Sequence, residues 1–420
     1  MNKSDKKFNG HLTEHFFRNE YGKIVSVITR YIGVNNVETA EDIVQETLLK
    51  ATDIWRQNGV PENPKAWLYK TAKNLTLNIL KRKKYEQQYR TATEKHPLEF
   101  KQLPFSDEMI LDEQLKMMFV CCHPSISENY QIALILKILC GFSITEIANA
   151  FFSTKETINK RLVRGRKQLR QNNISFEIPK DINTSLPIVQ KTVYLLFNEG
   201  YSPTQKNELI RFDLCLEAIR LIKILVANKT IKEKSDSYAL LALMHLNASR
   251  FEARMNDDNL IVEMEKQNRS KWNSNLIAKG IQYLNQAMKG GKISKYFILA
   301  TISANHCIAK EFKDTNWKEI LSLYNTLLAI EDSPTIRLNR AVALSNAQGS
   351  EIAIKELKSI NLNSDIGNYH LFHTTLAELY KRENNLKMTI QHLKKAISLA
   401  KNKRDLKLLE KKLIDTVPIS

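Results

Sequence analysis

SITEIANAFFSTKETINKRLVRGRKQLR, residues 143–170, is the stretch of this chain whose pattern most restricts its fold. Its first half repeats small and apolar residues at helical spacing, namely Ile144, Ile147, Ala148 and Phe151. Ser153 and Thr154 then offer an N-cap, and a second helix follows with one small or apolar face. That face consists of Ile158, Leu162, Gly165 and Leu169. The stretch therefore predicts a helix-turn-helix.

The second helix of this pair is strongly basic. Between Thr154 and Arg170 it holds seven basic residues and one acidic residue, Glu156. If the apolar face packs on the preceding helix, the polar face is presented to a DNA major groove. There the N-terminal part reads bases and the C-terminal cations hold phosphates. The residues expected on that face are Thr157, Lys160, Arg161, Arg164 and Lys167. The alternative is a basic helix that faces only solvent.

The charge of the whole chain also favours a polyanionic partner. Its 420 residues include 63 Lys and Arg against 45 Asp and Glu, which gives a formal charge of +18. The length suggests about two to four domains, and the residue usage predicts an all-α protein. No apolar run approaches the roughly 20 residues that a membrane helix needs, and the N-terminus lacks a signal-peptide core. We therefore expect a cytoplasmic protein.

No set of residues predicts catalysis, a cofactor or a metal centre. The five cysteines are scattered, as reduced thiols would be, and Cys121, Cys122 and His123 lack the spacing of a zinc site. The chain has no glycine-rich phosphate loop. Four clustered carboxylates are expected to mark a helix start: Asp107, Glu108, Asp112 and Glu113. We accordingly expect no enzymatic activity, no cofactor and no metal.

Breaks in the helical pattern divide the chain into four parts. Residues 9–84 form a first helical domain, interrupted at 58–64, where glycine and prolines cannot continue a helix. The polar residues 85–105 read as a flexible linker. A second domain at 106–172 contains the helix-turn-helix, and residues 173–420 form a long helical extension.

The extension contains an internal repeat. Residues 339–360 resemble residues 373–397 at an offset of about 34 residues, a period typical of tetratricopeptide (TPR) helical hairpins. Two aligned pairs carry the similarity: Ala343 on Ala377 and, after a slip of two residues, Leu357 on Leu393. A helix at 317–330 would complete the preceding hairpin. We expect a stack of hairpins whose concave surface binds a protein or peptide.

Two helices expected in the first domain carry further binding patterns. Residues 40–55 form an amphipathic helix, whose apolar face holds Val44, Leu48, Ala51 and Trp55. Another face holds Asp42, Gln45, Glu46 and Leu49, and it either faces solvent or docks on a basic partner helix; the pattern leaves both open. Residues 64–84 interleave aromatic residues with basic and amide residues, as single-stranded DNA binding requires. Taken alone, Trp67 of this helix is better explained as a core residue.

In this order, the segments resemble bacterial RNA polymerase sigma factors of the extracytoplasmic-function type. DIVQETLLKA at 42–51 and PKAWLYKTAKNLTLNILKRKK at 64–84 resemble region 2, and residues 143–170 resemble region 4. Four further motifs resemble the branch of that family with a long C-terminal, TPR-like extension. These are CCHP at 121–124, LVRGRK at 162–167, LFNEGY at 196–201 and NRSKW at 268–272.

The resemblance implies contacts with core RNA polymerase and with promoter DNA. Region 2 would grip the β′ coiled coil of polymerase through Asp42, Gln45 and Glu46, with Leu49 and Trp55 supporting the contact. It would also capture a base flipped from the -10 element, through Trp67, Lys70, Lys73, Asn74, Asn78, Lys81 and Arg82. Region 4 would contact the β flap and face the -35 duplex through Lys155, Thr157, Asn159, Lys160, Arg161, Arg164, Arg166 and Lys167. The extension would join the sigma domains at Phe197, Asn198, Glu199, Gly200 and Tyr201.

We therefore interpret the chain as a sigma factor that directs transcription initiation and is regulated by its extension. One alternative is a sensor-type helix-turn-helix regulator with a TPR partner-binding domain, which would not direct transcription with core enzyme alone. A second is a TPR scaffold with incidental basic helices, which would not bind DNA at any salt concentration.

Overall fold

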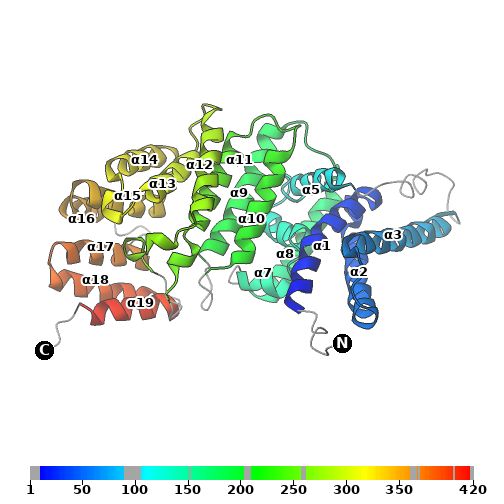
Figure 1. The fold of residues 1–420 in the computed structure, drawn as a ribbon, viewed down its shortest axis with the longest axis horizontal. Helices are drawn as coiled ribbons and strands as arrows, with labels where there is room; N and C mark the ends of the chain where they lie inside the picture. The colour runs from blue at the N-terminus through cyan, green and yellow to red at the C-terminus, as the bar shows by residue number, and fades with distance from the viewer. Residues whose placement is uncertain are drawn as a thin grey trace. The chain divides into compact units, whose positions relative to one another are not determined.

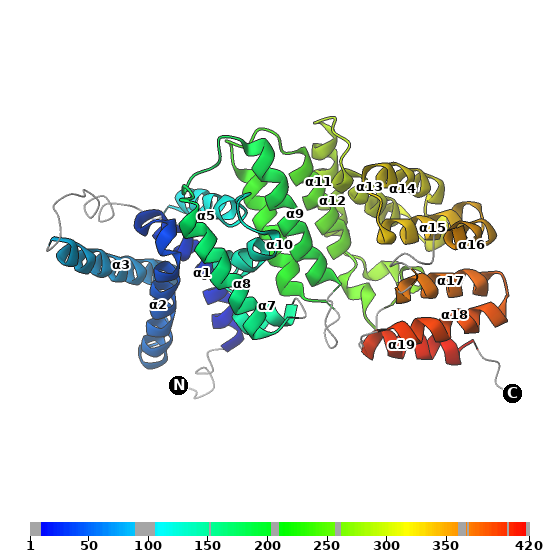
Figure 2. The same ribbon diagram turned by 180° about the vertical axis from the view of Figure 1, so that it is seen from behind.

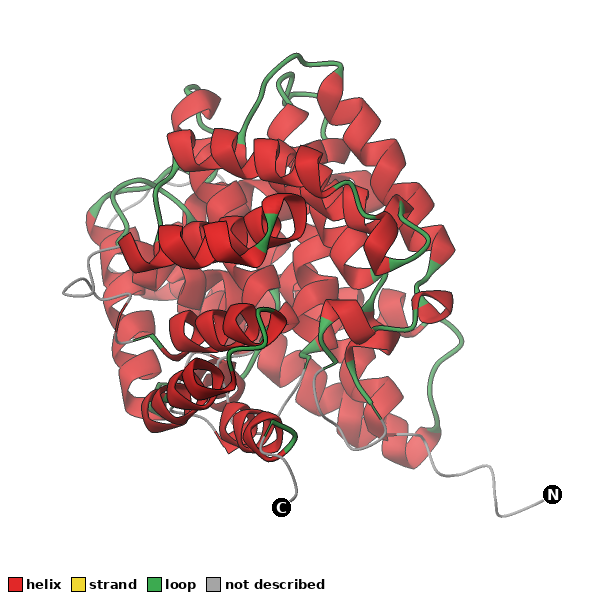
Figure 3. Cartoon of the chain, turned by 90° about the vertical axis from the view of Figure 1, so that its left-hand side faces the viewer, coloured by secondary structure: helices red, strands yellow, loops and turns green. Residues whose placement is uncertain are grey.

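The computed structural model describes residues 10–88, 106–150, 153–202, 210–256, 262–359, 367, 369–400 and 403–416. Within these ranges the chain forms helices and turns without a β-strand, as Figure 3 shows, so the prediction of an all-α protein is confirmed. No helix in these ranges is long and apolar enough to cross a membrane. The chain, traced in Figures 1 and 2, divides into two compact units. They are Met1–Leu196 with Lys223–Ile231, and Phe197–Ile222 with Lys232–Ser420.

The first unit begins with a three-helix bundle. Its members are α1 (Gly10–Ile32), α2 (Val37–Asn58) and α3 (Pro64–Gln88), with the short turn η1 (Val34–Asn36) before α2. After α2, Gly59 has a φ of 83°, a conformation that residues with a side chain rarely adopt. Pro64 then starts α3, because its fixed φ suits a first helical position. The predicted break at 58–64 is confirmed, whereas α3 continues four residues into the predicted linker, whose residues 89–105 lie outside the described ones.

A second helical bundle completes the first unit. It consists of α5 (Asp107–Cys121), α6 (Glu128–Leu134), the π-helix η2 (Ile135–Leu139), α7 (Ile144–Ala150), α8 (Lys155–Gln171) and most of α9 (Ile182–Tyr201). α7 and α8 are the two helices predicted at 143–170. Thr154 caps α8 by accepting a hydrogen bond from the Thr157 amide at 3.1 Å. All four residues of the predicted small or apolar face of α8 are buried, whereas Phe151 lies outside the described residues.

The four clustered carboxylates have two different roles. Asp107 and Glu108 occupy the first turn of α5, where the helix dipole favours negative charge, as predicted. Glu113 is instead buried in the middle of the helix and forms an ion pair with Arg30 of α1. Asp112 pairs with a lysine of its own helix at 2.9 Å. The helix-start interpretation is therefore wrong for Asp112 and Glu113.

The cysteines are all free thiols. Cys121 and Cys122 are buried at the end of α5, and burial raises the pKa of Cys122 to about 12. No three His, Cys, Asp or Glu side chains of the described residues come together as a metal site.

The second unit is built of successive helical hairpins. It begins with the last residues of α9 and most of α10 (Phe212–Ala227), whose other residues belong to the first unit. The helices that follow are α11 (Ser235–Ala248), α12 (Ser274–Met288), α13 (Lys295–Ile308), α14 (Trp317–Ile330), α15 (Pro334–Gln348), α16 (Ser350–Ser359), α17 (His370–Arg382), α18 (Leu386–Leu399) and α19 (Lys403–Ile414). Single 3-10 turns lie between them: η3 (Phe251–Arg254), η4 (Met264–Lys266), η5 (Arg269–Lys271) and η6 (Phe312–Asp314). From α11 to α19, helices that are neighbours in sequence pack on each other.

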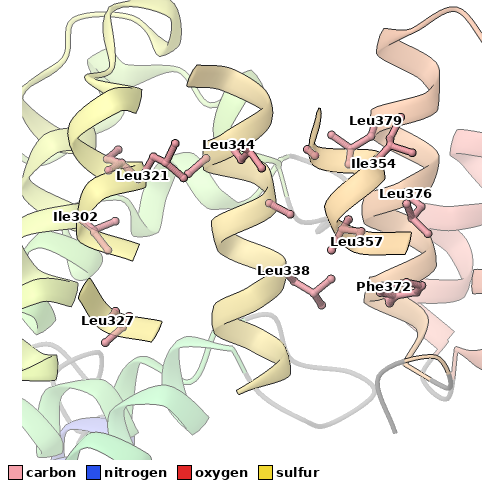
Figure 4. Close-up of a cluster of buried hydrophobic side chains, with 14 of the residues drawn as sticks. Ile302, Leu321, Leu327, Leu338, Leu344, Ile354, Leu357, Phe372, Leu376 and Leu379 are labelled. Atoms are coloured by element: carbon pink, nitrogen blue, oxygen red, sulfur yellow. The ribbon is translucent and has the colours of Figure 1, made fainter. Parts of the chain in front are cut away.

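The predicted repeat corresponds to the hairpins α15–α16 and α17–α18. Ala343 and Ala377, the small residues aligned at the offset, are both buried, as are Leu357 and Leu393. The helix predicted at 317–330 is α14. Residues from α13 to α17 share one continuous apolar core, shown in Figure 4. Such sharing between neighbours is what stacked hairpins need, because one hairpin alone cannot bury its apolar face.

Candidate nucleic-acid interface

The acidic stripe of α2 lies on its exposed face. Asp42, Gln45, Glu46 and Leu49 are all exposed, and 63% of Leu49 is open to solvent. The opposite face of the helix is buried in the bundle. Glu46 makes only a local ion pair, with Lys50 at 2.8 Å. The stripe is therefore a surface that combines negative charge with an exposed leucine.

Trp55, which was expected to contact polymerase together with this stripe, belongs to the core. Trp55 is 7% exposed. The centroid of its ring lies 5.5 Å from that of Phe17 and 5.6 Å from that of Trp67, on which it packs edge-on. Trp55 thus supports α2 from inside the bundle, and the expectation of a direct contact is corrected. Trp67 is half-buried, in agreement with its interpretation as a core residue.

The polar residues of α3 form an exposed face. Those at four-residue spacing, Lys70, Asn74, Asn78 and Arg82, are exposed, and Lys81 lies beside them. Lys73 is half-buried. The helix therefore presents amides flanked by cations along one side, whereas the aromatic residues of the predicted pattern are turned inward, with Tyr69 buried and Trp67 half-buried.

A hollow of about 590 Å³ opens at the start of this helix. It is lined by Asn63, Lys65, Ala66, Tyr69, Lys70, Lys73, Ser106 and Asp107. Lys65 pairs with Asp107 across it, and the buried Tyr69 donates a hydrogen bond to Glu20 at 3.0 Å. Burial, together with the neighbouring Glu20 carboxylate, raises the pKa of Tyr69, so its hydroxyl stays neutral. The sequence pattern missed Asn63 and Lys65, which lie on the loop and first turn before the patterned part of α3.

Most of the residues predicted to contact duplex DNA lie on the open side of α8. Lys155, Asn159, Lys160, Arg164 and Lys167 are exposed, and Thr157 and Arg161 are half-buried. Glu156, the one acidic residue of the helix, pairs with Lys160 at 2.6 Å. The prediction that the apolar side faces inward and the basic side outward is confirmed for these positions.

Arg166 departs from this pattern, because its side chain turns toward α2. Its guanidinium lies 2.5 Å from the Glu41 carboxylate and 3.7 Å from Glu38, and only 13% of the side chain is exposed. Arg170, one turn later, pairs with Glu38 at 2.7 Å. Burial raises the pKa of Glu41, and the charge of Arg166 opposes that shift.

These ion pairs correct the expectation that Arg166 faces the -35 duplex. In this arrangement two cations of α8 are held by carboxylates at the start of α2. Sequence reasoning missed Glu38 and Glu41 because no local pattern marks them: Glu41 is separated from its partner by 125 positions along the chain.

The LFNEGY residues lie at the end of α9, where the second unit begins. Phe197 is buried and stacks on Tyr201, with 5.8 Å between centroids. Gly200 is the second-to-last residue of α9, which ends at Tyr201. What Gly200 allows is a close approach. A Cβ atom there would lie 2.7 Å from the Cys215 sulfur and 2.8 Å from the Arg211 carbonyl oxygen.

The NRSKW residues are tied to LFNEGY through Arg250. This arginine is 9% exposed, contacts the Tyr201 hydroxyl, and lies over the rings of Tyr201 and Trp272 at 5.9 and 5.6 Å. Arg269 donates to the carbonyl oxygens of His306 and, at 2.7 Å, Ala309, at the end of α13. Both motifs therefore hold helices of the extension together.

Comparison with known proteins finds family matches in two separate segments of the chain. Residues 16–85 match the family described as Sigma-70 region 2, and residues 185–288 match a family of unknown function, DUF6596. An uncharacterized protein of Rhizobium meliloti (strain 1021), R00370, is 30% identical over 384 residues, which are 90% of this chain and 89% of that protein. The ECF RNA polymerase sigma factor SigE of Mycolicibacterium smegmatis is 28% identical over 141 residues, 32% of this chain and 52% of its own length.

The close approach at Gly200 generates a prediction about stability. In an open helix, Gly→Ala stabilises by about 1 kcal/mol. Here we expect Gly200→Ala to destabilise the second unit by about 1–3 kcal/mol, because the new methyl group meets backbone atoms that must shift. Thermal and urea unfolding followed by circular dichroism would measure the change. A variant as stable as the parent or more stable would show that α9 and α10 do not approach so closely.

Proposed function

Because the chain belongs to the RNA polymerase sigma factors of the extracytoplasmic-function type that carry a long C-terminal extension, we propose that it binds core RNA polymerase and directs initiation at specific promoters. The observation that carries this proposal is the pair of exposed faces within the segment that matches Sigma-70 region 2. The acidic stripe of α2 is open to a basic partner, and the polar face of α3 is open to DNA.

The α2 stripe supplies the polymerase contact. Asp42, Gln45 and Glu46 offer charge to a basic coiled coil, and the exposed Leu49 offers apolar area in the middle of the contact. Trp55 and its aromatic neighbours hold α2 at a fixed orientation from the inside. A rigid helix face of this kind loses little entropy on binding.

The α3 face captures the opened -10 element. Asn74, at the centre of the exposed face, offers an amide to the edge of a flipped base, and Lys70 and Arg82 hold the flanking phosphates. The hollow beside Lys70 is large enough to receive a nucleobase. Capture of the extruded base offsets the few kcal/mol that unstacking costs, so recognition and strand opening are coupled.

α8 reads the -35 duplex from its N-terminal half. We expect Arg161 and Asn159 to contact base edges, and Lys167 and Arg164 to contact phosphates. The second unit regulates these steps and offers its hairpin stack to a protein or peptide. Transcription requires a cytoplasmic location.

Run-off transcription by purified core enzyme, with and without this protein, is the direct test. The absence of a promoter-specific product would contradict the proposal.

Charge reversal on the stripe should abolish polymerase binding. We expect Asp42→Lys with Glu46→Lys to eliminate pull-down of core enzyme, since like charges across the contact cost several kcal/mol. The fold should persist because both side chains are exposed. The matched control is Glu351→Lys with Glu383→Lys, two exposed carboxylates of the extension with the same change in net charge. Binding by the stripe variant at the level of this control would exclude the stripe as the contact.

Two substitutions in α8 should affect different properties of DNA binding, one its sequence specificity and the other its overall affinity. Arg161→Ala should reduce discrimination at one -35 position by about 1–3 kcal/mol, because it removes a base contact. Lys167→Ala should weaken binding to all sequences and lower the slope of log K against log salt by about one unit. Titrations on matched and mismatched duplexes at several salt concentrations would distinguish the two. If Arg161→Ala changed only the salt slope and Lys167→Ala changed the sequence preference, α8 would be rotated in the groove relative to this assignment.

Removal of residues 317–420 should reduce run-off transcription sharply while duplex DNA binding persists. The truncation exposes apolar residues of α13 that α14–α17 cover in the intact chain, but leaves the first unit complete. Transcription and DNA binding would be compared after confirming by scattering that the protein is monodisperse. Equal transcription by the truncated and full-length proteins would refute a regulatory role for these hairpins.

A further inference from the structure

A short acidic segment of the extension, residues 262–267, lies against its C-terminal helices. The segment contains the turn η4 and comes between α11 and α12 in the chain. The carboxylate of Glu263 pairs with Lys412 of α19, and that of Glu265 pairs with Arg382 of α17 at 3.2 Å. The paired residues are 149 and 117 positions apart. A Glu-X-Glu sequence therefore meets two cations that come from the far end of the extension.

The hairpins themselves hold these two cations in place. Glu378 and Arg382 lie one turn apart on α17, so they share a face of that helix. Glu378 pairs with Lys412 at 2.5 Å, and Asn346 of α15 accepts a hydrogen bond from Arg382 at 3.1 Å. Burial alone would lower the pKa of Lys412, but the Glu378 and Glu263 carboxylates raise it above its usual value. Each cation keeps a partner on the helices even without the acidic segment.

The acidic segment is held mainly by its charges. The turn η4 buries none of its residues, and the side chain of Glu265 is 58% exposed. By contrast, the side chain of Lys412 is only 11% exposed. Ion pairs that remain partly exposed contribute little to stability. The segment can therefore leave the two cations while the helices that carry them stay packed.

A hollow of about 570 Å³ continues from this contact. Its lining includes Glu265, Gln267, Lys310 and Lys313, and both lysines are exposed. Gln267 is 9% exposed, and its Oε1 accepts no hydrogen bond from the part of the chain that the structure describes. A bound peptide would supply a backbone N–H to this oxygen and further carboxylates to the lysines. The hollow thus suits the continuation of an acidic chain.

We propose that Lys412 and Arg382 form a binding site for an acidic Glu-X-Glu segment of a partner protein, and that residues 263–265 of this chain occupy the site until the partner displaces them. The partner's two carboxylates form charge-assisted hydrogen bonds with the cations, and its chain extends into the hollow. The proposal rests on the proposed function, in which the hairpin stack receives a protein or peptide, and adds the chemistry of that partner.

Displacement of the segment bears on the motif that follows it. The acidic segment leads directly into NRSKW at 268–272. Within that motif, the ring of Trp272 lies 5.6 Å from the guanidinium of Arg250, which also contacts the Tyr201 hydroxyl of LFNEGY. Release of residues 263–265 therefore reaches the contacts at the start of the second unit.

Peptide binding to the full-length protein tests the site. The probe is a labelled synthetic peptide of residues 262–268, VEMEKQN, blocked at both ends, and the control peptide carries glutamine at both glutamate positions. In the protein, Glu263→Gln with Glu265→Gln empties the site. The matched control, Glu319→Gln with Glu351→Gln, neutralises two exposed carboxylates of the same unit.

By fluorescence anisotropy, we expect the emptied protein to bind the acidic peptide about tenfold or more tightly than the parent and the control variant do. A site that is already occupied binds in proportion to its free fraction. Arg382→Gln with Lys412→Gln, added to the emptied protein, should abolish binding. The same change in net charge at two exposed lysines of α18, Lys387→Gln with Lys395→Gln, should not. Equal affinity of parent and emptied protein, or of the two peptides, would overturn the proposal.

Hydrogen exchange in the parent tests displacement without any substitution, and it remains valid if the emptied protein does not fold. Within the segment, the amides of Lys266 and Gln267 donate to the carbonyl oxygens of Glu263 and Met264 at 2.9 and 3.3 Å. Their exchange should become several-fold faster when the acidic peptide is added. Unchanged exchange at about millimolar peptide, the usual effective concentration of a tethered competitor, would contradict displacement.

Sedimentation and run-off transcription separate the remaining outcomes. If the parent dimerises and the acidic peptide dissociates the dimer, the occupant is a second copy of this chain, and the proposal of a partner protein is wrong. If the peptide binds and displaces the segment but no promoter-specific product forms with core enzyme, the sigma function fails while the site stands. If the parent directs transcription and the emptied protein does not bind the peptide, the site fails alone.

Discussion

The burial of Arg166 between α8 and α2 is the interaction on which the arrangement of the first unit depends. The charge of the buried guanidinium is compensated by the carboxylate of Glu41, itself 2% exposed, which also accepts a hydrogen bond from the hydroxyl of the buried Tyr21 at 3.3 Å. In the same unit α1 packs on η2, and position 22 can carry no side chain there, because a Cβ atom would lie 2.0 Å from the Leu139 carbonyl oxygen. A charge contact and a steric contact, far apart in sequence, thus impose the same placement of the two bundles.

Within that placement the binding surfaces are not equally accessible. The α2 stripe and the polar face of α3 are open, whereas α8 has an open N-terminal half and a partly occupied C-terminal half. Base readers at the start of a recognition helix and phosphate contacts at its end have different consequences, because the latter supply affinity regardless of sequence. Glu38 and Glu41 lie at the C-terminal end of α8, where they pair with Arg166 and Arg170.

In the extension, the residues of the LFNEGY and NRSKW motifs act as structural contacts. Arg250 connects them, since it contacts Tyr201 and lies over Trp272, and Arg269 satisfies carbonyl groups at the end of α13. These contacts position the first helices of the hairpin stack, whose core continues through α17. A partner that binds the hairpins would therefore act on a continuous packed structure, in which a shift of one helix is transmitted to its neighbours.

The sequence by itself determined the helical elements, because periodicity and capping are local properties. These properties predicted the helices at 143–170, the break at 58–64, the hairpin repeat and the polar faces of α2 and α3. It could not determine that Gly200 permits a close approach to Cys215 and Arg211, or that Glu113 pairs with Arg30. Nor could it show that Arg166 faces α2. Its position on α8 is compatible with DNA or with a carboxylate, and only tertiary packing brings Glu41, 125 positions away, within 2.5 Å. A helical pattern specifies which side of a helix is polar, whereas the partner of that side depends on how the helices pack.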